Sequence, residues 1–223
     1  MSNETILLVI KFKIGGSLRF LSHAETVKLF QRACVRAGIN MQYSRGFNPR
    51  PRLSLPLPRT VAVASDDDLL CLRVNRDLKE SQIADYDSRI KDRLSGQLPK
   101  DCVLLSVEAV GANVSYQPDS ATYVFSLPPE SINERLKAVI ERLLASESLN
   151  LHRRVDAKYS KFKNVDVRPF LKSIEIVDKE IVVECKISSA GTVRVDEILK
   201  LLEIEPEKLT TPIRRKNVKW KVN

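Results

Sequence analysis

Histidine and cysteine are scarce in this chain of 223 residues, which holds two histidines and four cysteines. The cysteines, at positions 34, 71, 102 and 185, lie far apart and form no CxxC pair. Zinc and iron–sulfur centres take their ligands from clustered cysteine and histidine, so the sequence argues against both. Each cysteine has apolar neighbours, and we expect buried free thiols and no metal or other cofactor.

Long apolar runs are also missing, since none reaches the roughly 18 residues that a membrane-spanning helix needs. The first residues, MSNETILLVIKFK, lack the basic start and cleavage site of a signal peptide and are typical of a strand. We therefore predict a cytoplasmic protein without a membrane partner. The sequence contains no GxxxxGKS/T or GxGxxG phosphate loop, no HExxH zinc motif and no GxSxG hydrolase elbow.

Acidic residues are absent from a long N-terminal stretch. Between Thr26 and Ser65 the chain has seven lysines and arginines and no aspartate or glutamate. The net charge is +9; residues 1–60 contribute +8 and residues 208–223 contribute +6, whereas the middle of the chain is slightly acidic. A localised positive field attracts polyanions and steers their approach. The charge pattern therefore indicates a polyanionic partner but specifies no reaction.

The two halves of the chain have the same expected order of elements. In the first half, strands are predicted at 5–14, 53–57, 69–74 and 103–110, with helices at 22–38 and 79–95. In the second half, strands at 121–127, 170–177, 181–187 and 218–222 accompany a helix after Pro128 and another at 194–203. This βαββαβ order predicts an α+β protein of two tandem ferredoxin-like halves, residues 1–112 and 113–223. A single mixed α+β domain is the alternative.

The strongest functional candidate is the segment YSRGFNPRPR, part of a stretch over 40–52 that its prolines predict to be irregular. Arginine forks match phosphate oxygens, and aromatic rings stack on unpaired bases. Proline and glycine fix the backbone and reduce the entropy lost on binding. We predict nucleic-acid contacts by Tyr43, Arg45, Phe47, Arg50 and Arg52. The alternative is a structural loop with solvated arginines and Phe47 folded into the core.

The preceding helix is expected to carry a basic stripe. Ser22 and Glu25 have the spacing of a capping box and predict where this helix begins. Lys28, Arg32 and Arg36 follow at four-residue intervals, so they share one helix face and would extend a phosphate-binding track. An ordinary solvated helix face is the alternative.

A third basic region, residues 149–168, interleaves cations with aromatic side chains and is predicted to be an irregular insertion. Its candidate nucleic-acid contacts are Arg153, Arg154, Lys158 and Arg168, and the alternative is a basic surface loop. His23, in the first turn of the helix at 22–38, is a weak candidate for acid–base cleavage at a 2′-hydroxyl. The alternative for His23 is packing or a polar contact at the helix start.

Several of these motifs resemble a known family. The segments GSLRFLSH (16–23), Arg32-Ala33 and YSRGFNPRPR (43–52) are similar to the radical-SAM-linked family of uncharacterised proteins, with a weaker collinear likeness elsewhere that includes Asp166–Pro169. In that family the domain stands alone, or beside or fused to a cobalamin-binding radical-SAM enzyme, which implies an accessory role towards such a partner. Ala24 and Glu25 stand where the family more often has Leu-Asp. The chain lacks the CxxxCxxC triplet of radical-SAM enzymes, so it is not the radical enzyme itself.

Together these features predict a non-enzymatic accessory protein that binds or presents RNA, with RNA and a radical-SAM protein as partners. Paired ferredoxin-like halves with a basic loop are also similar to the RNA-processing proteins of CRISPR systems, which favours RNA over DNA. One alternative is a protein-interaction module that docks a radical-SAM partner without nucleic acid. Another is a metal-independent endoribonuclease that uses His23.

Overall fold

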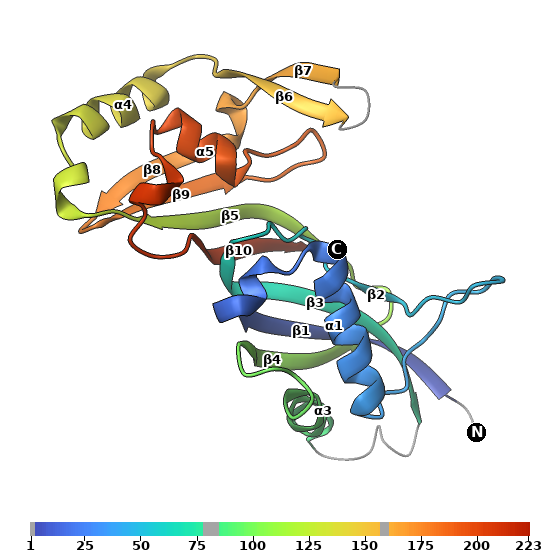
Figure 1. Cartoon of the computed structure of the whole chain (residues 1–223). Coiled ribbons are helices and arrows are strands. Elements are labelled where there is room, and N and C mark those ends of the chain that lie inside the picture. The colour runs from blue at the N-terminus through green and yellow to red at the C-terminus, as the bar shows by residue number, and fades with distance from the viewer. Residues whose placement is uncertain (1–2, 78–84, 157–160) are drawn as a thin grey trace. The chain divides into compact units, whose positions relative to one another are not determined.

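The computed structural model describes residues 3–77, 85–156 and 161–223. The chain forms two compact units. The first comprises Met1–Gln117 together with Trp220–Asn223, and the second comprises Pro118–Lys219. Each unit packs helices on β-strands (Figure 1), so the predicted α+β class is confirmed. The division falls a few residues beyond the predicted boundary at 112/113, and the last four residues join the first unit. Within these ranges, no helix is long and apolar enough to cross a membrane.

The strands of the first unit lie in the order β4, β1, β3, with β2 paired to β3. In chain order the elements are β1 (Asn3–Ile14), a short 3₁₀ helix (Gly16–Phe20), α1 (His23–Arg36), β2 (Leu53–Ser54), β3 (Ala64–Asp77), α3 (Tyr86–Ser95) and β4 (Cys102–Gly111). β1 is antiparallel to β3 and to β4, and β2 is antiparallel to β3. The strands predicted for this half are therefore all present, with shifted ends.

Alternation along β1 distributes its apolar side chains over both faces of the sheet. Ile6 and Leu8 lie in the main core with Phe30 of α1 and Ile90 of α3, so both helices cover this face. The rings of Phe12 and Phe30 meet edge to face, with their centroids 4.6 Å apart. This contact fixes α1 against β1, and α1 in turn positions the basic stripe.

The opposite face of the same sheet has a smaller apolar cluster. Leu7 and Val9 of β1 pack there with Cys71 of β3. Tyr116 and Trp220 are half-buried against this cluster. A residue close to the end of the sequence therefore completes the packing of the first unit.

The strands of the second unit lie in the order β10, β5, β9, β8. Its elements are β5 (Tyr116–Ser126), a 3₁₀ helix (Pro129–Ser131), α4 (Glu134–Ala145), β6 (Asn150–Asp156), β7 (Lys161–Asp166), a 3₁₀ helix (Arg168–Phe170), β8 (Leu171–Val177), β9 (Glu180–Lys186), α5 (Val195–Leu201), a 3₁₀ helix (Pro206–Lys208) and β10 (Arg214–Val222). β9 is antiparallel to β5 and to β8. β6 and β7 form a separate two-stranded sheet.

The prediction of an irregular insertion at 149–168 is wrong, because β6 and β7 form an antiparallel hairpin. Leu151 and Arg153 are half-buried while His152 and Arg154 are exposed, which is the period-two pattern of a strand. The high charge of the segment conceals this pattern in the sequence. The helix expected over 79–95 is present as α3, and residues 79–84 lie outside the described part of the chain.

All four cysteines are buried free thiols, as predicted. Burial raises the pKa of the Cys34 and Cys185 thiols to about 12. These two thiols are therefore protonated at neutral pH, and a protonated thiol is a poor nucleophile.

Candidate nucleic-acid interface

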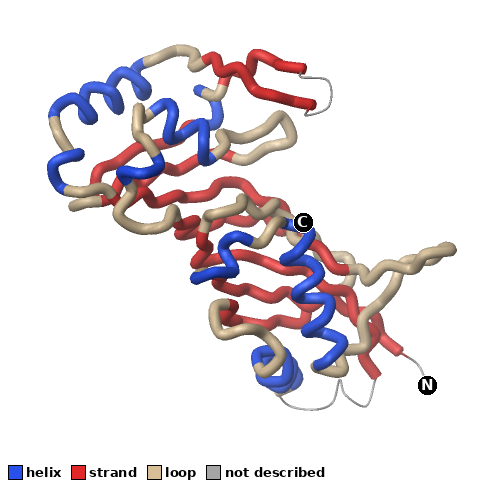
Figure 2. The backbone as a smooth tube through the Cα atoms, in the orientation of Figure 1, coloured by secondary structure: helices blue, strands red, loops and turns tan. Residues whose placement is uncertain are grey.

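Residues 41–52 form a narrow, two-limbed projection, which we call the arm, that leaves the first unit between α1 and β2 (Figures 1 and 2). Arg52 N donates to Gln42 O at 2.7 Å and joins the two limbs. β3 holds both limbs at their base, because Gln42 N donates to Arg73 O at 2.8 Å and Arg73 N donates to Arg52 O at 2.9 Å. The arm is thus hydrogen-bonded to the sheet from which it projects.

As predicted, residues 40–52 form no helix or strand, but isolated pairing between the two limbs gives the segment some order. Tyr43 and Pro51 form a β-bridge, and next to it Ser44 N donates to Arg50 O at 2.8 Å. The bridge has its hydrogen bonds on either side of the Tyr43–Pro51 pair, so it needs no N–H from Pro51. A proline can therefore occupy this position without breaking the pairing.

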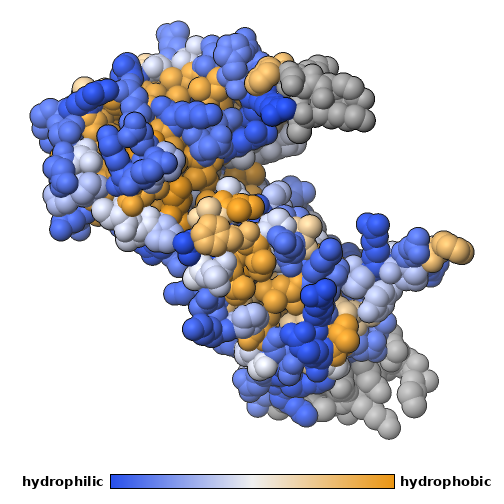
Figure 3. All heavy atoms as spheres, in the orientation of Figure 1, coloured by the Kyte–Doolittle hydropathy of each residue, from blue (hydrophilic) through white to orange (hydrophobic). Residues whose placement is uncertain are grey.

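The tip of the arm presents an aromatic ring to solvent. Phe47 is fully exposed, at 101%, so it does not fold into the core. In Figure 3 the outermost atoms of the arm are coloured as apolar on a largely polar projection. Gly46 precedes Phe47 with a φ of +134°, which side chains other than glycine rarely allow. Glycine therefore permits the turn that leads into this exposed ring.

Three guanidinium groups lie on the same arm. Arg45, Arg50 and Arg52 are exposed, and no hydrogen bond or ion pair ties their side chains to another described residue. No acidic residue occurs from Thr26 to Ser65, so the arm has no carboxylate of its own to neutralise them. These groups are therefore available to an anionic partner.

The basic stripe on α1 forms as the spacing predicts. Lys28, Arg32 and Arg36 are all exposed. Arg36 is held in place by Gln97, because its Nη2 donates to Gln97 O at 2.6 Å and its Nε to Gln97 Oε1 at 3.2 Å. The predicted capping box of Ser22 and Glu25 is also present, so the N-terminal end of α1 is well defined.

The stripe and the arm meet at a shallow depression of about 300 Å³, which we call the foot hollow. Its lining residues are Gln31, Arg32, Val35, Arg36, Met41, Tyr43 and Pro51. The structure thus brings two cations of α1 together with an aromatic residue of the arm. Val35 and Met41 were not among the predicted site residues. The sequence signal that could have revealed this hollow is Val35, an apolar residue that lies between Arg32 and Arg36 on the otherwise polar face of the helix.

Arg153, one of the predicted contacts in the second unit, has a structural partner. Its guanidinium is ion-paired with Glu197, and Nη2 also donates to Thr192 O at 2.9 Å. The side chain of Arg153 is only 12% exposed. A phosphate could reach it only by displacing this pair, so we remove Arg153 from the interface.

Arg168 is engaged in the same way by backbone carbonyls. Its guanidinium donates to the carbonyl oxygens of Leu144, Ser146 and Leu171 at 2.8, 2.9 and 2.9 Å. It therefore closes the C-terminal end of α4 and is removed from the interface as well. Arg154 is exposed on β6 and its contact with nucleic acid stays a prediction, whereas Lys158 lies outside the described residues.

His23 is the first residue of α1 and is half-buried. Its Nδ1 is buried and has no hydrogen-bond partner among the described residues. Among the described residues, no second acid–base group is hydrogen-bonded to the His23 side chain, and catalysis by His23 stays a prediction.

Nowhere in the described part of the chain are three histidine, cysteine or acidic side chains placed to hold a metal ion.

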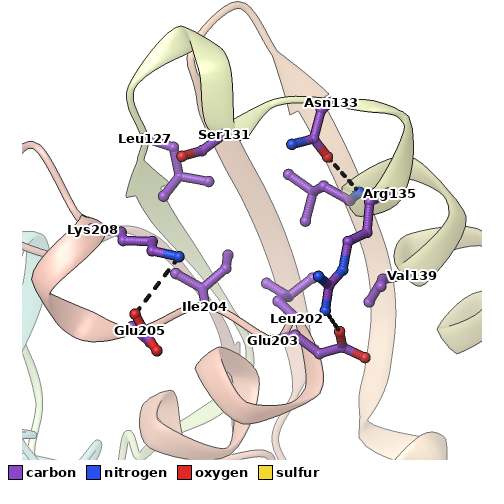
Figure 4. A pocket seen from close by; sticks show the side chains of 11 residues that line it. Leu127, Ser131, Asn133, Arg135, Val139, Leu202, Glu203, Ile204, Glu205 and Lys208 are labelled. Carbon is purple, nitrogen blue, oxygen red and sulfur yellow. Dashed lines mark hydrogen bonds and ion pairs between the residues drawn. The ribbon is translucent and has the colours of Figure 1, made fainter.

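A hollow of about 340 Å³ in the second unit differs from the foot hollow in its charges (Figure 4). Its apolar lining comes from Leu127, Leu136, Val139, Leu202 and Ile204. Two of its cations are already paired, Arg135 with Glu203 at 3.0 Å and Lys208 with Glu205 at 3.6 Å. Because these charges cancel, the hollow offers a polyanion little attraction.

Comparisons with known proteins give one clear relationship. No curated protein matches the chain. A solved structure described as a putative glycine cleavage system transcriptional repressor is similar over 98% of this chain and 96% of that chain, at 9% identity and a TM-score of 0.23. This TM-score is too low to establish a shared fold. A family profile described as "Uncharacterized protein conserved in bacteria (DUF2344)" matches residues 8–198. Since that match covers most of the sequence, the chain belongs to this conserved bacterial family.

Proposed function

We propose that this protein is a non-enzymatic accessory protein that binds RNA on the arm and on the basic stripe of α1. The observation that carries the proposal is the full exposure of Phe47 on an arm that also bears Arg45 and Arg50. An exposed ring can stack on an unpaired base, and nearby guanidinium groups can hold the adjoining phosphates. This combination is typical of single-stranded nucleic-acid binding.

The hydrogen bonds within the arm support the same proposal. They hold the two limbs together before any partner arrives, so less conformational entropy is lost on binding than with a free loop. Arg32 and Lys28 on α1 would extend the track of positive charge beyond the arm. Tyr43 would add a second stacking surface at its base.

We further propose that each unit is a ferredoxin-like βαββαβ module. The strand orders support this, because each unit places its fourth strand beside its first, then its third, then its second. In the second unit, the β6–β7 hairpin would be an insertion between the first helix and the second strand. Basic surfaces on such modules suit an RNA-presenting role.

The proposed protein partner is a radical-SAM enzyme, to which this chain would present its RNA. This part of the proposal depends on the sequence resemblance of the GSLRFLSH and YSRGFNPRPR segments. Isolation of a tagged chain from native lysate, with and without nuclease, tests it. Recovery of a radical-SAM protein in either sample supports the partnership, and its absence from both contradicts it.

RNA binding itself is tested by fluorescence anisotropy with a labelled single-stranded RNA at several salt concentrations. Arg45→Ala with Arg50→Ala removes two proposed phosphate contacts, so the negative slope of log affinity against log salt should become shallower by about 1.4. Phe47→Ala removes one proposed stacking surface and should weaken binding about tenfold. Circular dichroism checks that each variant is folded.

A matched control removes the same charge elsewhere. Lys179→Ala with Lys186→Ala changes two exposed cations of the second unit. This pair should leave the affinity for RNA near that of the unaltered protein. If it weakens binding as much as the arm variants do, the protein attracts RNA by net charge alone and the arm has no special role. If the arm variants bind normally, the proposal is wrong.

A further inference from the structure

We propose that the foot hollow is a binding site for one unpaired nucleotide, whose base lies against Tyr43 and whose phosphate is held by Arg32. This inference rests on the proposed RNA binding and adds a defined site in which Tyr43, Val35 and Arg32 act together on one nucleotide. It concerns a different part of the surface from Phe47, which lies at the far end of the arm.

The lining of the foot hollow has the composition of a base-binding surface. Tyr43 is 46% exposed and Val35 is 61% exposed, so an aromatic and an aliphatic surface both face the opening. Pro51 and the buried Met41 complete the apolar part. A nucleobase is flat and apolar on its faces, and it gains by covering such a surface.

The rim of the hollow has the charge that a phosphate requires. Arg32 is exposed and no described residue holds its side chain. Arg36 is fixed by its two hydrogen bonds to Gln97, so its position is set before a ligand arrives. No lining residue is acidic. The half-buried amide of Gln31 is a polar group that can meet the edge of a base.

The wall of the hollow is held by the base of the arm. Tyr43 and Pro51 are bridge partners, and the bond from Arg52 N to Gln42 O lies beside them. The aromatic wall is therefore part of a hydrogen-bonded structure, and little order must be created on binding. A base inside a duplex has both faces covered by its neighbours, so an unpaired nucleotide can use this wall and the interior of a duplex cannot.

The test isolates the hollow from the tip by working in Phe47→Ala protein. Binding is measured for an eight-nucleotide RNA and for the same backbone with every base removed. If the hollow takes a base, Phe47→Ala protein should still prefer the intact RNA by about tenfold. Adding Tyr43→Ala or Val35→Asp should abolish this preference. With Tyr43→Ala both probes keep their salt-dependent attraction to the arginines, whereas the carboxylate of Val35→Asp, three residues from Arg32, should weaken the binding of both probes alike.

Val61→Asp is the matched control for Val35→Asp. Val61 is 52% exposed and does not line the hollow, so this variant changes charge and side chain identically at another exposed position of the first unit. The preference for intact RNA should survive Val61→Asp. If both valine variants abolish it, the effect comes from charge or from unfolding, and the assignment of the hollow is overturned.

Other outcomes separate this inference from the proposed function. If RNA binds and the arm variants weaken it, but intact and base-free probes bind equally to Phe47→Ala protein, the inference alone fails. If the unaltered protein binds neither probe, the proposed function fails with it. If a glutamate-rich peptide containing leucine displaces RNA from the unaltered protein but not from Val35→Asp, the hollow accepts protein and the inference is overturned.

Discussion

Arg153 and Glu197 meet through two parallel hydrogen bonds, from Nε to Oε1 at 2.7 Å and from Nη2 to Oε2 at 2.6 Å. Both side chains are nearly buried, at 12% and 7% exposed. Burial alone raises the pKa of Glu197, but the hydrogen bonds from Arg153 and from the Arg194 backbone lower it overall. The pair therefore stays charged inside the second unit and ties β6 to α5.

We expect Arg153→Ala to destabilise the protein because it leaves the Glu197 carboxylate buried without its partner. The loss should be about 3 kcal/mol in urea unfolding followed by circular dichroism. Lys163→Ala removes an exposed cation on neighbouring β7 and should change stability little. In buffer without urea, provided that Arg153→Ala is folded, the affinity of this variant for RNA should match that of the unaltered protein. A selective loss of RNA binding would return Arg153 to the interface.

Gly46→Ala should separate binding from stability. A Cβ at this position meets nothing within 4 Å, but the φ of +134° is strained for alanine. The tip should therefore change shape, while the remainder of the first unit is unaffected. We expect weaker RNA binding at an unchanged midpoint of thermal unfolding. Normal affinity in this variant would show that the shape of the tip does not matter for binding.

Glu184 should make the second unit sensitive to acid. Its pKa is lowered to about 2 by hydrogen bonds from Lys219 and Ser120, with Lys172 contributing further. A lowered carboxyl pKa adds stability above the ordinary pKa near 4.5, and this stability is lost as the pH falls towards 2. Because the group is partly solvated, its contribution should be about 1 kcal/mol.

Urea unfolding of Glu184→Gln at pH 6, 4 and 2.5 measures this effect. The variant should be less stable than the unaltered protein at pH 6, and the difference should shrink as the pH falls. Glu175→Gln, which neutralises an exposed carboxylate on β8, is the control. A difference that grows towards low pH would contradict the assignment.

Glu203→Gly removes two ion pairs and at the same time relieves a backbone conformation that disfavours side chains. Glu203 follows α5 with a φ of +57°, and Ile204 N donates to Leu199 O at 2.9 Å in the geometry that glycine favours at a helix end. Its carboxylate pairs with Arg142 at 2.9 Å and with Arg135 at 3.0 Å, and these contacts lower its pKa.

Salt distinguishes the two contributions at Glu203. Concentrated sodium chloride screens exposed ion pairs but leaves backbone strain unchanged. We therefore expect the glycine variant to gain stability relative to the unaltered protein as salt increases, and to be at least as stable at 1 M. A variant that stays equally destabilised at every salt concentration would show that the carboxylate acts through packing.

Local signals allowed the main elements to be predicted. The start of α1 follows from Ser22 and Glu25, whose reciprocal hydrogen bonds involve residues only three apart. Phe30 and Cys34 of the same helix are buried, in agreement with its apolar spacing. These features depend only on residues close together in the sequence, so they can be predicted from a single sequence.

The roles of individual arginines could not be predicted in the same way. The carboxylate that binds Arg153 is 44 residues away in the sequence, and two of the carbonyls that hold Arg168 are more than 20 residues away. A count of charges cannot reveal such partners. The exposure of Phe47 was equally hidden, because an aromatic residue between glycine and asparagine suits a core position as well as a solvent-exposed tip.

The contact that Trp220 makes with the β1 cluster has a consequence for synthesis. A ribosome that has made the first 117 residues has supplied nearly all of the first unit but not this tryptophan. The apolar face around Leu7 and Val9 therefore stays partly uncovered while about a hundred further residues emerge. The first unit can finish folding only after residue 220 has been translated, so a nascent fragment that ends at residue 117 is expected to be prone to aggregation.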